Sequence, residues 1–288
     1  MATNQMRREA AKRKLENQQR RRAERARRRQ RVAIITSVSV VVVVVLAVVL
    51  LSTVGLPGGD DTAAPSTDAA PTSAAAAGVP ESIPTEIAPA PARPTPLPAT
   101  VSCEYPASDE PAAKPVEPPS GGEVSAQGTV NVTLQTNAGA IPLTLDRALA
   151  PCTVHNFESL ARQSFYDATP CHRLTTGAGL QVLQCGDPSG LGTGGPGYTI
   201  PDEVFPELTY GRGTVAMAKT AAPNSGGSQF FLVYGDAQLP PEYTAFGTIS
   251  PEGLEVIDQI ARRGQDQSNG STDGRPVEQV TIERAQLG

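Results

Sequence analysis

The chain has 288 residues, of which 18% are charged, and its net charge at neutral pH is −5. This total averages two opposite parts, because residues 1–31 hold 13 Lys and Arg against three Glu, a net charge of +10, and the rest of the chain carries −15. Only two histidines and four cysteines are present, and no cysteine pair has zinc-finger spacing, so the composition argues against a zinc site.

An uncharged apolar run follows the basic arm and covers residues 32–54. As a helix it would be about 34 Å long, enough to cross a hydrocarbon core of ~30 Å. We interpret it as a transmembrane helix rather than a secretory signal, because the apolar region of a signal is shorter and residues 52–57 form a poor cleavage site. The positive-inside rule then keeps residues 1–31 in the cytoplasm and places everything after Leu56 on the extracytoplasmic side of the cell membrane.

The arginine-rich arm also has the charge of a nucleic-acid-binding segment, since clustered arginines neutralise phosphates. With a membrane span directly beside it, a topology signal and attraction to anionic lipid headgroups explain this charge more simply. We therefore expect the arm to contact the membrane and expect no nucleic-acid partner.

Residues 55–122 are dominated by Ala, Pro, Ser and Thr. Such a composition buries too little apolar surface to offset its ordering entropy, so we expect a disordered linker. Cys103 and Tyr105 lie near its end, and two alternatives remain open for them: docking on the folded domain, or a stray cysteine in a disordered segment.

The four cysteines, Cys103, Cys152, Cys171 and Cys185, all follow the apolar run. An even number on the oxidising side of a membrane indicates up to two disulfides, with three possible connectivities. The sequence leaves the pairing open.

Residues 123–288 are expected to fold as one mainly β domain. Alternating apolar residues predict a β-hairpin of strands 130–136 and 141–146. Helical spacing predicts helices over 150–161 and 251–262, and Pro151 suits the first turn of the former. Further short strands are predicted at 171–175, 180–185, 213–218, 228–234, 244–249 and 277–284. Many short strands with two helices indicate a closed antiparallel barrel with helical caps.

The run Gly-Gly-Ser-Gln-Phe-Phe at 226–231 leads from a flexible turn into a strand. Because side chains alternate along a strand, Gln229 and Phe231 share one face, and Phe230 and Leu232 point to the other. One face can pack into a core while the other lines a pocket.

Two further segments carry polar side chains, Cys171 to Leu174 and Gln184 to Asp187. If they are the arms of a hairpin, Arg173 and Gln184 project from the same face, and a permanent cation with five donors lies beside an amide. A surface ion pair is the alternative role for Arg173.

Other motifs carry less weight. His155 and His172 lie in no local nucleophile motif, so we interpret both as structural. Gly190, Gly192 and Gly195 fit G-x-G-x-x-G, but a Pro-Gly pair follows at once and no helix can begin there, so we treat the match as a coincidence.

Over residues 128–286 the chain resembles the cyclophilin-type peptidyl-prolyl isomerases. The motifs that carry the resemblance occur in family order at 151–157, 165–167, 172–173, 184–187, 217–218, 227–231 and 246–247. With the anchor and linker, the chain resembles bacterial membrane-anchored cyclophilins. The resemblance implies a closed eight-stranded antiparallel barrel capped by two α-helices, acting on X-Pro bonds without metal or cofactor.

The resemblance also implies the site residues. Arg173 matches the family arginine, which can donate to the prolyl nitrogen only when the amide twists and that nitrogen regains a lone pair, and Gln184 matches the glutamine beside it. The substrate-binding positions implied are Leu180, Val182, Ala218, Lys219, Gln229, Phe231, Leu239 and Tyr243. Phe231 would be the floor of a proline pocket, with Gln229 at its rim.

Several positions depart from the family pattern. The interval between Arg173 and Gln184 is longer than usual, so Val182 and Leu180 stand in for a methionine and an aromatic residue. Lys219 replaces an asparagine whose backbone contacts the peptide, and Tyr243 replaces a histidine. The chain has no tryptophan, the residue that contacts cyclosporin in drug-sensitive members, so we expect weak cyclosporin binding.

The sequence therefore predicts an extracytoplasmic prolyl isomerase that assists the folding of secreted, proline-containing proteins. One alternative is a proline-segment binding module or holdase chaperone with little turnover, because the pocket wall is altered. Another is a scaffold that positions partners at the membrane.

Overall fold

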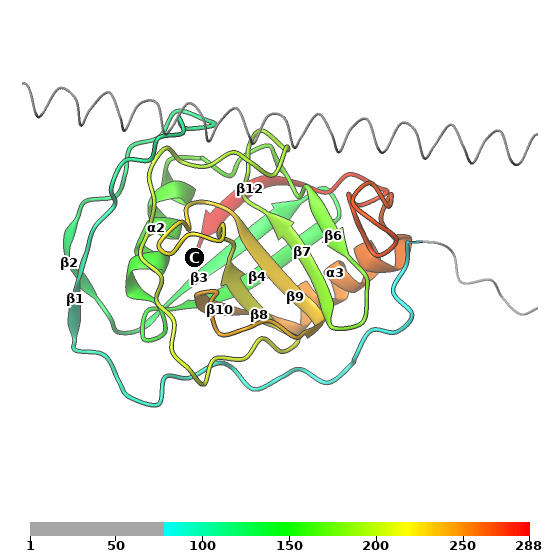
Figure 1. The fold of residues 1–288 in the computed structure, drawn as a ribbon, viewed down its shortest axis with the longest axis horizontal. Coiled ribbons are helices and arrows are strands. Elements are labelled where there is room, and N and C mark those ends of the chain that lie inside the picture. Colours follow the sequence, from blue (N-terminus) through cyan, green and yellow to red (C-terminus); the bar gives the residue numbers. More distant parts are fainter. Residues whose placement is uncertain (1–77) are drawn as a thin grey trace, which may run out of the picture. The chain divides into compact units, whose positions relative to one another are not determined.

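The computed structural model describes residues 78–288 (Figure 1). The predicted basic arm, the transmembrane helix at 32–54 and the linker as far as residue 77 lie outside these residues and stay predictions. Within residues 78–288, no helix has the length and apolar character that a membrane crossing requires.

The domain is built on one curved antiparallel sheet, with strand order β11-β6-β7-β9-β8-β10-β4-β3-β12-β5. Its strands are β3 (Thr129–Thr136), β4 (Gly139–Asp146), β5 (Thr169–Pro170), β6 (Arg173–Thr175), β7 (Leu180–Cys185), β8 (Thr214–Met217), β9 (Phe230–Ala237), β10 (Ala245–Ile249), β11 (Asp273–Gly274) and β12 (Thr281–Leu287). The predicted mainly β fold is thus present, and each predicted strand has a counterpart.

The strand count and the closure differ from the prediction of a closed eight-stranded barrel. The sheet has ten strands and ends at β11 and β5, which are not paired with each other. These two end strands are two residues long, and each pairs with only one neighbour, β6 or β12. These short segments form hydrogen bonds with the backbone groups that an edge strand would otherwise leave unpaired. The sequence does not predict them, because a segment of two residues is too short to show an alternating pattern.

Two helices accompany the sheet, α2 (Pro151–Arg162) and α3 (Pro251–Arg263), within one or two residues of the predicted ranges. Each begins with a proline in its first turn, where the missing N–H costs nothing. The Ser250 side chain caps α3 by accepting from the Gly253 backbone N–H at 3.1 Å.

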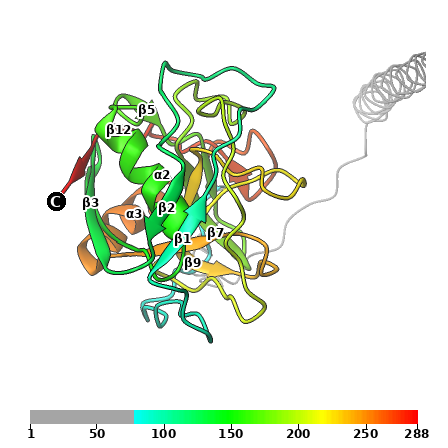
Figure 2. The ribbon, with the colours of Figure 1, turned by 90° about the vertical axis from the view of Figure 1, so that its left-hand side faces the viewer.

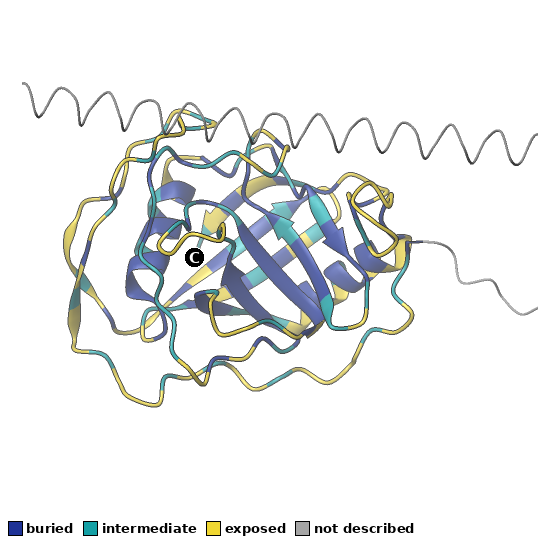
Figure 3. Cartoon of the chain, in the orientation of Figure 1, coloured by how far each residue is buried: buried dark blue, intermediate teal, exposed yellow. Residues whose placement is uncertain are grey.

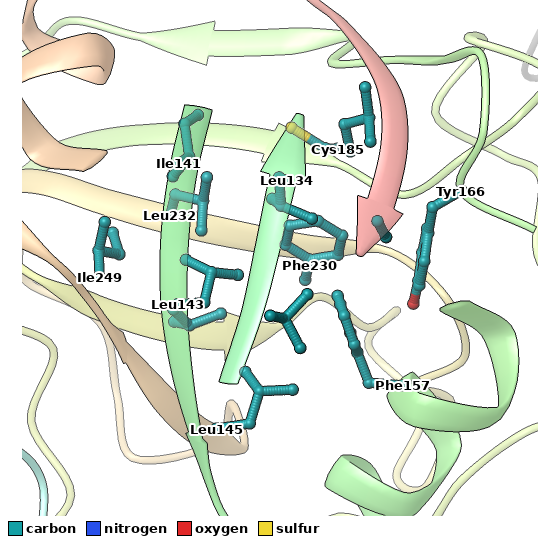
Figure 4. Packing of buried hydrophobic residues seen from close by; sticks show 14 of the residues in the cluster. Leu134, Ile141, Leu143, Leu145, Phe157, Tyr166, Cys185, Phe230, Leu232 and Ile249 are labelled. Atoms are coloured by element: carbon teal, nitrogen blue, oxygen red, sulfur yellow. The ribbon is translucent and has the colours of Figure 1, made fainter. Parts of the chain in front are cut away.

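The main core fills the space between the inner face of the sheet and the helices (Figures 3 and 4). Phe157 of α2 stacks on Tyr166 with ring centroids 4.7 Å apart and meets Phe230 of β9 edge to face at 5.4 Å. Leu134 and Leu145, from the β3–β4 hairpin, are fully buried in the same core. The core therefore fixes which face of β9 points inward.

The structure corrects the prediction of a disordered linker for its described part. Residues 78–122, which we call the strap, run along the outside of the domain (Figures 1 and 2). Its strand β1 (Thr100–Cys103) pairs with β2 (Gly122–Ser125), which begins at the last strap residue, in a separate two-stranded sheet. The strap lacks a core of its own, but it docks because its extended backbone offers hydrogen-bonding groups to the finished domain.

Polar contacts bind the strap along its length. The Gln265 backbone N–H donates to the Gly78 carbonyl at 2.9 Å, and the Ala88 N–H donates to the Arg212 carbonyl at 3.0 Å. Arg93 donates from Nε to the Leu149 carbonyl at 2.8 Å and from Nη2 to the Glu203 carbonyl at 2.9 Å. The strap is thereby part of the folded unit.

All four cysteines are paired, as Cys103–Cys152 and Cys171–Cys185. This settles the connectivity that the sequence leaves open. The first bond ties the strap to the start of α2, so of the two alternatives for Cys103, docking on the domain is the one seen. The second bond joins the segment before β6 to the end of β7.

Candidate active site

Strand β9 has two distinct faces, as the sequence predicts. Phe230 and Leu232 lie in the main core, whereas Phe231 and Val233 belong to a second apolar cluster on the outer face. The Gly-Gly-Ser-Gln-Phe-Phe run therefore does turn one side of the strand to the core and the other to a potential site.

The outer apolar cluster gathers most of the predicted pocket residues. Its buried members are Val182, Leu208, Tyr210, Ala216, Phe231, Val233, Ala237 and Ala245, and its half-buried ones include Leu180, Ala218, Leu239 and Tyr243. Phe231 is 5% exposed, and the Tyr243 ring meets it edge to face with centroids 5.7 Å apart. The chain thus brings together Phe231 and all five apolar or aromatic residues predicted to surround it.

Tyr210 is a member of this cluster that the sequence does not reveal. Its hydroxyl donates to the Tyr243 carbonyl at 2.7 Å and accepts from the Tyr243 N–H at 2.9 Å, which holds that segment in place. Burial raises the pKa of Tyr210 to about 12, so the phenol keeps its proton at neutral pH. Tyr210 lies outside the strands, and no periodicity marks it.

The polar part of the site is a chain of side-chain hydrogen bonds. Arg173 of β6 lies directly opposite Gln184 of β7, and Gln184 lies opposite Phe231 of β9. Arg173 Nη1 donates to Gln184 Oε1 at 3.3 Å, and Gln184 Nε2 donates to Gln229 Oε1 at 2.9 Å. Gln229 Nε2 then donates to the carbonyls of Gly192 and Gly194. The guanidinium and both amides are held in one row beside Phe231.

Asp273 of β11 completes this row and is absent from the sequence predictions. Arg173 Nε donates to both carboxylate oxygens of Asp273 at 3.0 Å, and Nη2 donates to Oδ2 at 2.6 Å. Burial works to raise the pKa of Asp273, but hydrogen bonds from Arg173 and Asn269 outweigh it, so this pKa is lowered. No local motif could have revealed the pair, because its members lie 100 residues apart.

His172 is buried beside the site without taking part in this hydrogen-bond row. Neither ring nitrogen has a hydrogen-bond partner among the described residues. Burial lowers its pKa, although the nearby Asp187 opposes this. The structural role of His172 stays a prediction.

The glycine loop that includes Gly190, Gly192 and Gly195 is organised by Asp187. Its carboxylate accepts hydrogen bonds from the backbone N–H groups of Ser189, Gly192 and Gly194 at 2.8 to 3.0 Å. No helix follows this loop, so the G-x-G-x-x-G match has a local structural explanation.

A groove of about 440 Å³ adjoins the row of amides. It is lined by Gln184 and Gln229, by the glycine loop at 192–199, by 218–220 and by three strap residues. Lys219 lies in this groove, and its Nζ is 3.3 Å from Asp202 Oδ2. A smaller hollow of about 210 Å³ lies beside Arg173 and also contacts Gln184. Gln184 therefore lines both hollows.

Comparisons with known proteins identify this arrangement. A family profile described as cyclophilin type peptidyl-prolyl cis-trans isomerase/CLD matches residues 131–287, more than half of the chain. The chain belongs to this family. The matched region begins after the strap, so the strap lies outside the part that the cyclophilin profile describes.

Among curated cyclophilins, the chain is 50% identical over 200 residues to a probable peptidyl-prolyl cis-trans isomerase B of Mycobacterium leprae, covering 65% of this chain and 67% of that protein. It is 48% identical over 194 residues to a protein of the same description from Mycobacterium tuberculosis, covering 63% of this chain and 62% of that one. The chain thus spans about two thirds of the length of these relatives.

Among solved structures, the fold is similar to a cyclophilin-type peptidyl-prolyl cis-trans isomerase of Cryptosporidium parvum, with a TM-score of 0.50 and 31% identity. That match covers 56% of this chain and 98% of the other. The similarity supports the cyclophilin fold of the domain, and the roles of individual residues stay predictions.

Proposed function

We propose that this cyclophilin-type isomerase accelerates rotation about X-Pro peptide bonds through the guanidinium of Arg173. The barrier of ~18 to 20 kcal/mol comes from amide resonance, which is lost in the twisted transition state. The prolyl nitrogen then regains a lone pair and can accept a hydrogen bond that the planar amide cannot.

The geometry around Arg173 supports this role. Asp273 accepts hydrogen bonds from Nε and Nη2 of Arg173, and Gln184 accepts one from Nη1. A guanidinium carries five N–H donors, so each Nη keeps a hydrogen for a substrate. Because three of its nitrogen contacts are fixed, the group is ordered before substrate binds, which lowers the cost of reaching the transition state.

The outer apolar cluster provides an apolar binding surface for the proline ring. Phe231 lies directly opposite Gln184 in the sheet, so a proline on Phe231 would place its nitrogen close to the polar row. Burial of a ring of this size contributes about 1.5 to 3 kcal/mol, by analogy with aliphatic side chains. The observation that carries the proposal is this neighbouring arrangement of an ordered Arg173 and an apolar seat.

We further propose that the domain acts on proline-containing segments of proteins outside the cytoplasm. Two disulfides support this, since such bonds form and persist in oxidising compartments. The uncharged run at 32–54 supports attachment to the membrane, and it stays a prediction.

The test is exchange NMR on a proline peptide with the full chain, comparing wild type with Arg173→Ala. We expect kcat/KM to fall by about 10²- to 10³-fold, as for loss of a donor that acts in the transition state. Arg284→Ala is the matched control, because Arg284 is exposed on β12, near the opposite end of the sheet order.

Other outcomes separate the alternatives. Binding of the peptide without acceleration of exchange by the wild type would favour a proline-segment binding module or holdase. Full activity in Arg173→Ala would refute the role of this guanidinium.

A further inference from the structure

The groove beside the polar row has one wall that comes from the strap. Ser108, Glu110 and Pro111 line it, and Ala218 and Lys219 line the same groove. The strap precedes the region matched by the cyclophilin profile, which begins at residue 131. The wall is therefore an addition to the isomerase domain that lies directly at its predicted binding residues.

Backbone hydrogen bonds attach this part of the strap to the glycine loop. The Ser108 N–H donates to the Gly197 carbonyl at 3.0 Å, and the Ala113 N–H donates to the Gly195 carbonyl at 2.8 Å. From the loop side, the Thr199 N–H donates to the Pro106 carbonyl at 2.9 Å. These hydrogen bonds hold the strap alongside the glycine loop.

The approach of strap and loop is close enough to require glycine. A Cβ on Gly194 would lie 2.9 Å from the Ala113 Cβ and 2.2 Å from Asp187 Oδ1. Gly197 has a φ of 83°, and a Cβ there would lie 3.0 Å from the Ala112 nitrogen. Since Gln229 donates to the carbonyl of Gly194, the same loop touches the strap and the polar row of the active site.

The charge of the groove is uneven. Glu110 and Lys219 are the charged residues that line it. Lys219 is compensated by Asp202, whereas the exposed carboxylate of Glu110 has no ion-pair or hydrogen-bond partner among residues 78–288. The groove therefore offers an unmatched negative charge at its strap wall.

We propose that the strap forms a wall of the substrate groove and that Glu110 makes the site select peptides with a basic side chain two residues from the proline. The proposal rests on the proposed function and adds a substrate preference to it. Alternate residues of an extended peptide point to the same side, so a side chain two positions from a proline seated on Phe231 faces the same surface. A Lys or Arg there would meet Glu110 at the rim.

The test uses the full chain and short peptides that carry Lys, Gln or Glu either two residues before or two residues after the proline. Dissociation constants come from NMR titration and exchange rates from the same samples. We expect the wild type to favour Lys over Glu by about 2- to 5-fold on one side of the proline, in the range of an exposed ion pair. This preference should shrink when ionic strength rises from about 0.01 M to about 1 M, because salt screens exposed charges.

Substitutions at one position give the decisive comparison. Glu110→Gln should remove the Lys-over-Glu preference, and Glu110→Lys should invert it. Glu104→Gln, an exposed strap residue that does not line the groove, should keep the wild-type preference.

Each outcome bears on one proposal. Equal affinity for Lys and Glu peptides in the wild type, or an unchanged preference in Glu110→Lys, would overturn the role of Glu110. A preference that depends on Glu110 in binding, without accelerated exchange for any peptide, would leave this inference standing and refute the isomerase mechanism.

Discussion

At the scale of single residues, the site depends on how Arg173 is held. The sequence reveals Arg173 and Gln184 because both lie in short family motifs. It does not reveal Asp273, since a carboxylate in a two-residue strand 100 residues away has no local pattern. The sequence does not predict Tyr210 either, because this member of the outer apolar cluster belongs to a segment without periodicity.

Asp273→Ala tests the positioning of Arg173. Without the carboxylate, the guanidinium loses its hydrogen bonds from Nε and Nη2 and samples more rotamers. In a smaller fraction of substrate complexes, the guanidinium is then positioned to donate to the prolyl nitrogen. We expect kcat to fall by about 10- to 100-fold with a smaller change in KM. Asp273→Asn, which keeps one acceptor, should recover part of the loss. Equal kcat in Asp273→Ala and in the control Glu283→Gln would contradict the positioning role.

His172 gives the domain a dependence on pH. Burial lowers its pKa in the folded state, with Asp187 opposing and Arg173 and Arg275 reinforcing the shift. The unfolded chain therefore binds more protons near and below the ordinary value of 6.5, and folding stability, fully present above that pH, is lost as the pH falls. Denaturant unfolding between about pH 7.5 and 5.5 should show a decrease that is smaller in His172→Gln.

An exposed residue without a titratable group provides the control for this experiment. Gln127→Ala should follow the wild-type profile in the same pH range. Identical slopes in wild type and His172→Gln would show that this imidazole does not control the acid sensitivity.

At the scale of elements, β6 and β7 are the pair that carries the polar row, and β6 is only three residues long. The ladder between them has two residue pairs, Arg173 with Gln184 and Leu174 with Leu183. Such a short pairing is weak by itself, since isolated short ladders are only marginally stable. The bond Cys171–Cys185 joins the segment just before β6 to the end of β7, beside these pairs, and reinforces the register that places Arg173 beside Gln184.

Replacing Cys171 and Cys185 by serine should therefore destabilise the domain. The bond closes a loop of sequence separation 14, for which the chain-entropy account gives about 3 kcal/mol of folding free energy. The comparison variant replaces Cys103 and Cys152, whose separation of 49 corresponds to about 4 kcal/mol. Denaturant unfolding measures both, and an unfolding free energy equal to that of the wild type would contradict the prediction.

At the scale of the whole molecule, the sequence predicts the strands and helices whose residues follow a local periodic pattern. The alternation over 130–136 and 141–146 and the proline at 151 correspond to β3, β4 and α2 with small changes of boundary. The strap is the main failure, because composition rules assume that a segment must bury its own apolar residues. Residues 78–122 instead use the surface of a finished domain, and such docking leaves no periodic pattern.

The bond Cys103–Cys152 has a mechanical consequence for this molecule. A pull applied from the N-terminal side reaches the strap at Gly78 and would break contacts such as that with Gln265 one after another, because they are loaded in series. At Cys103 the pull passes through a covalent link into α2, and peeling stops. The groove wall at 108–111 lies beyond this stop, so the substrate groove can keep its shape while the first 25 residues of the strap are stretched.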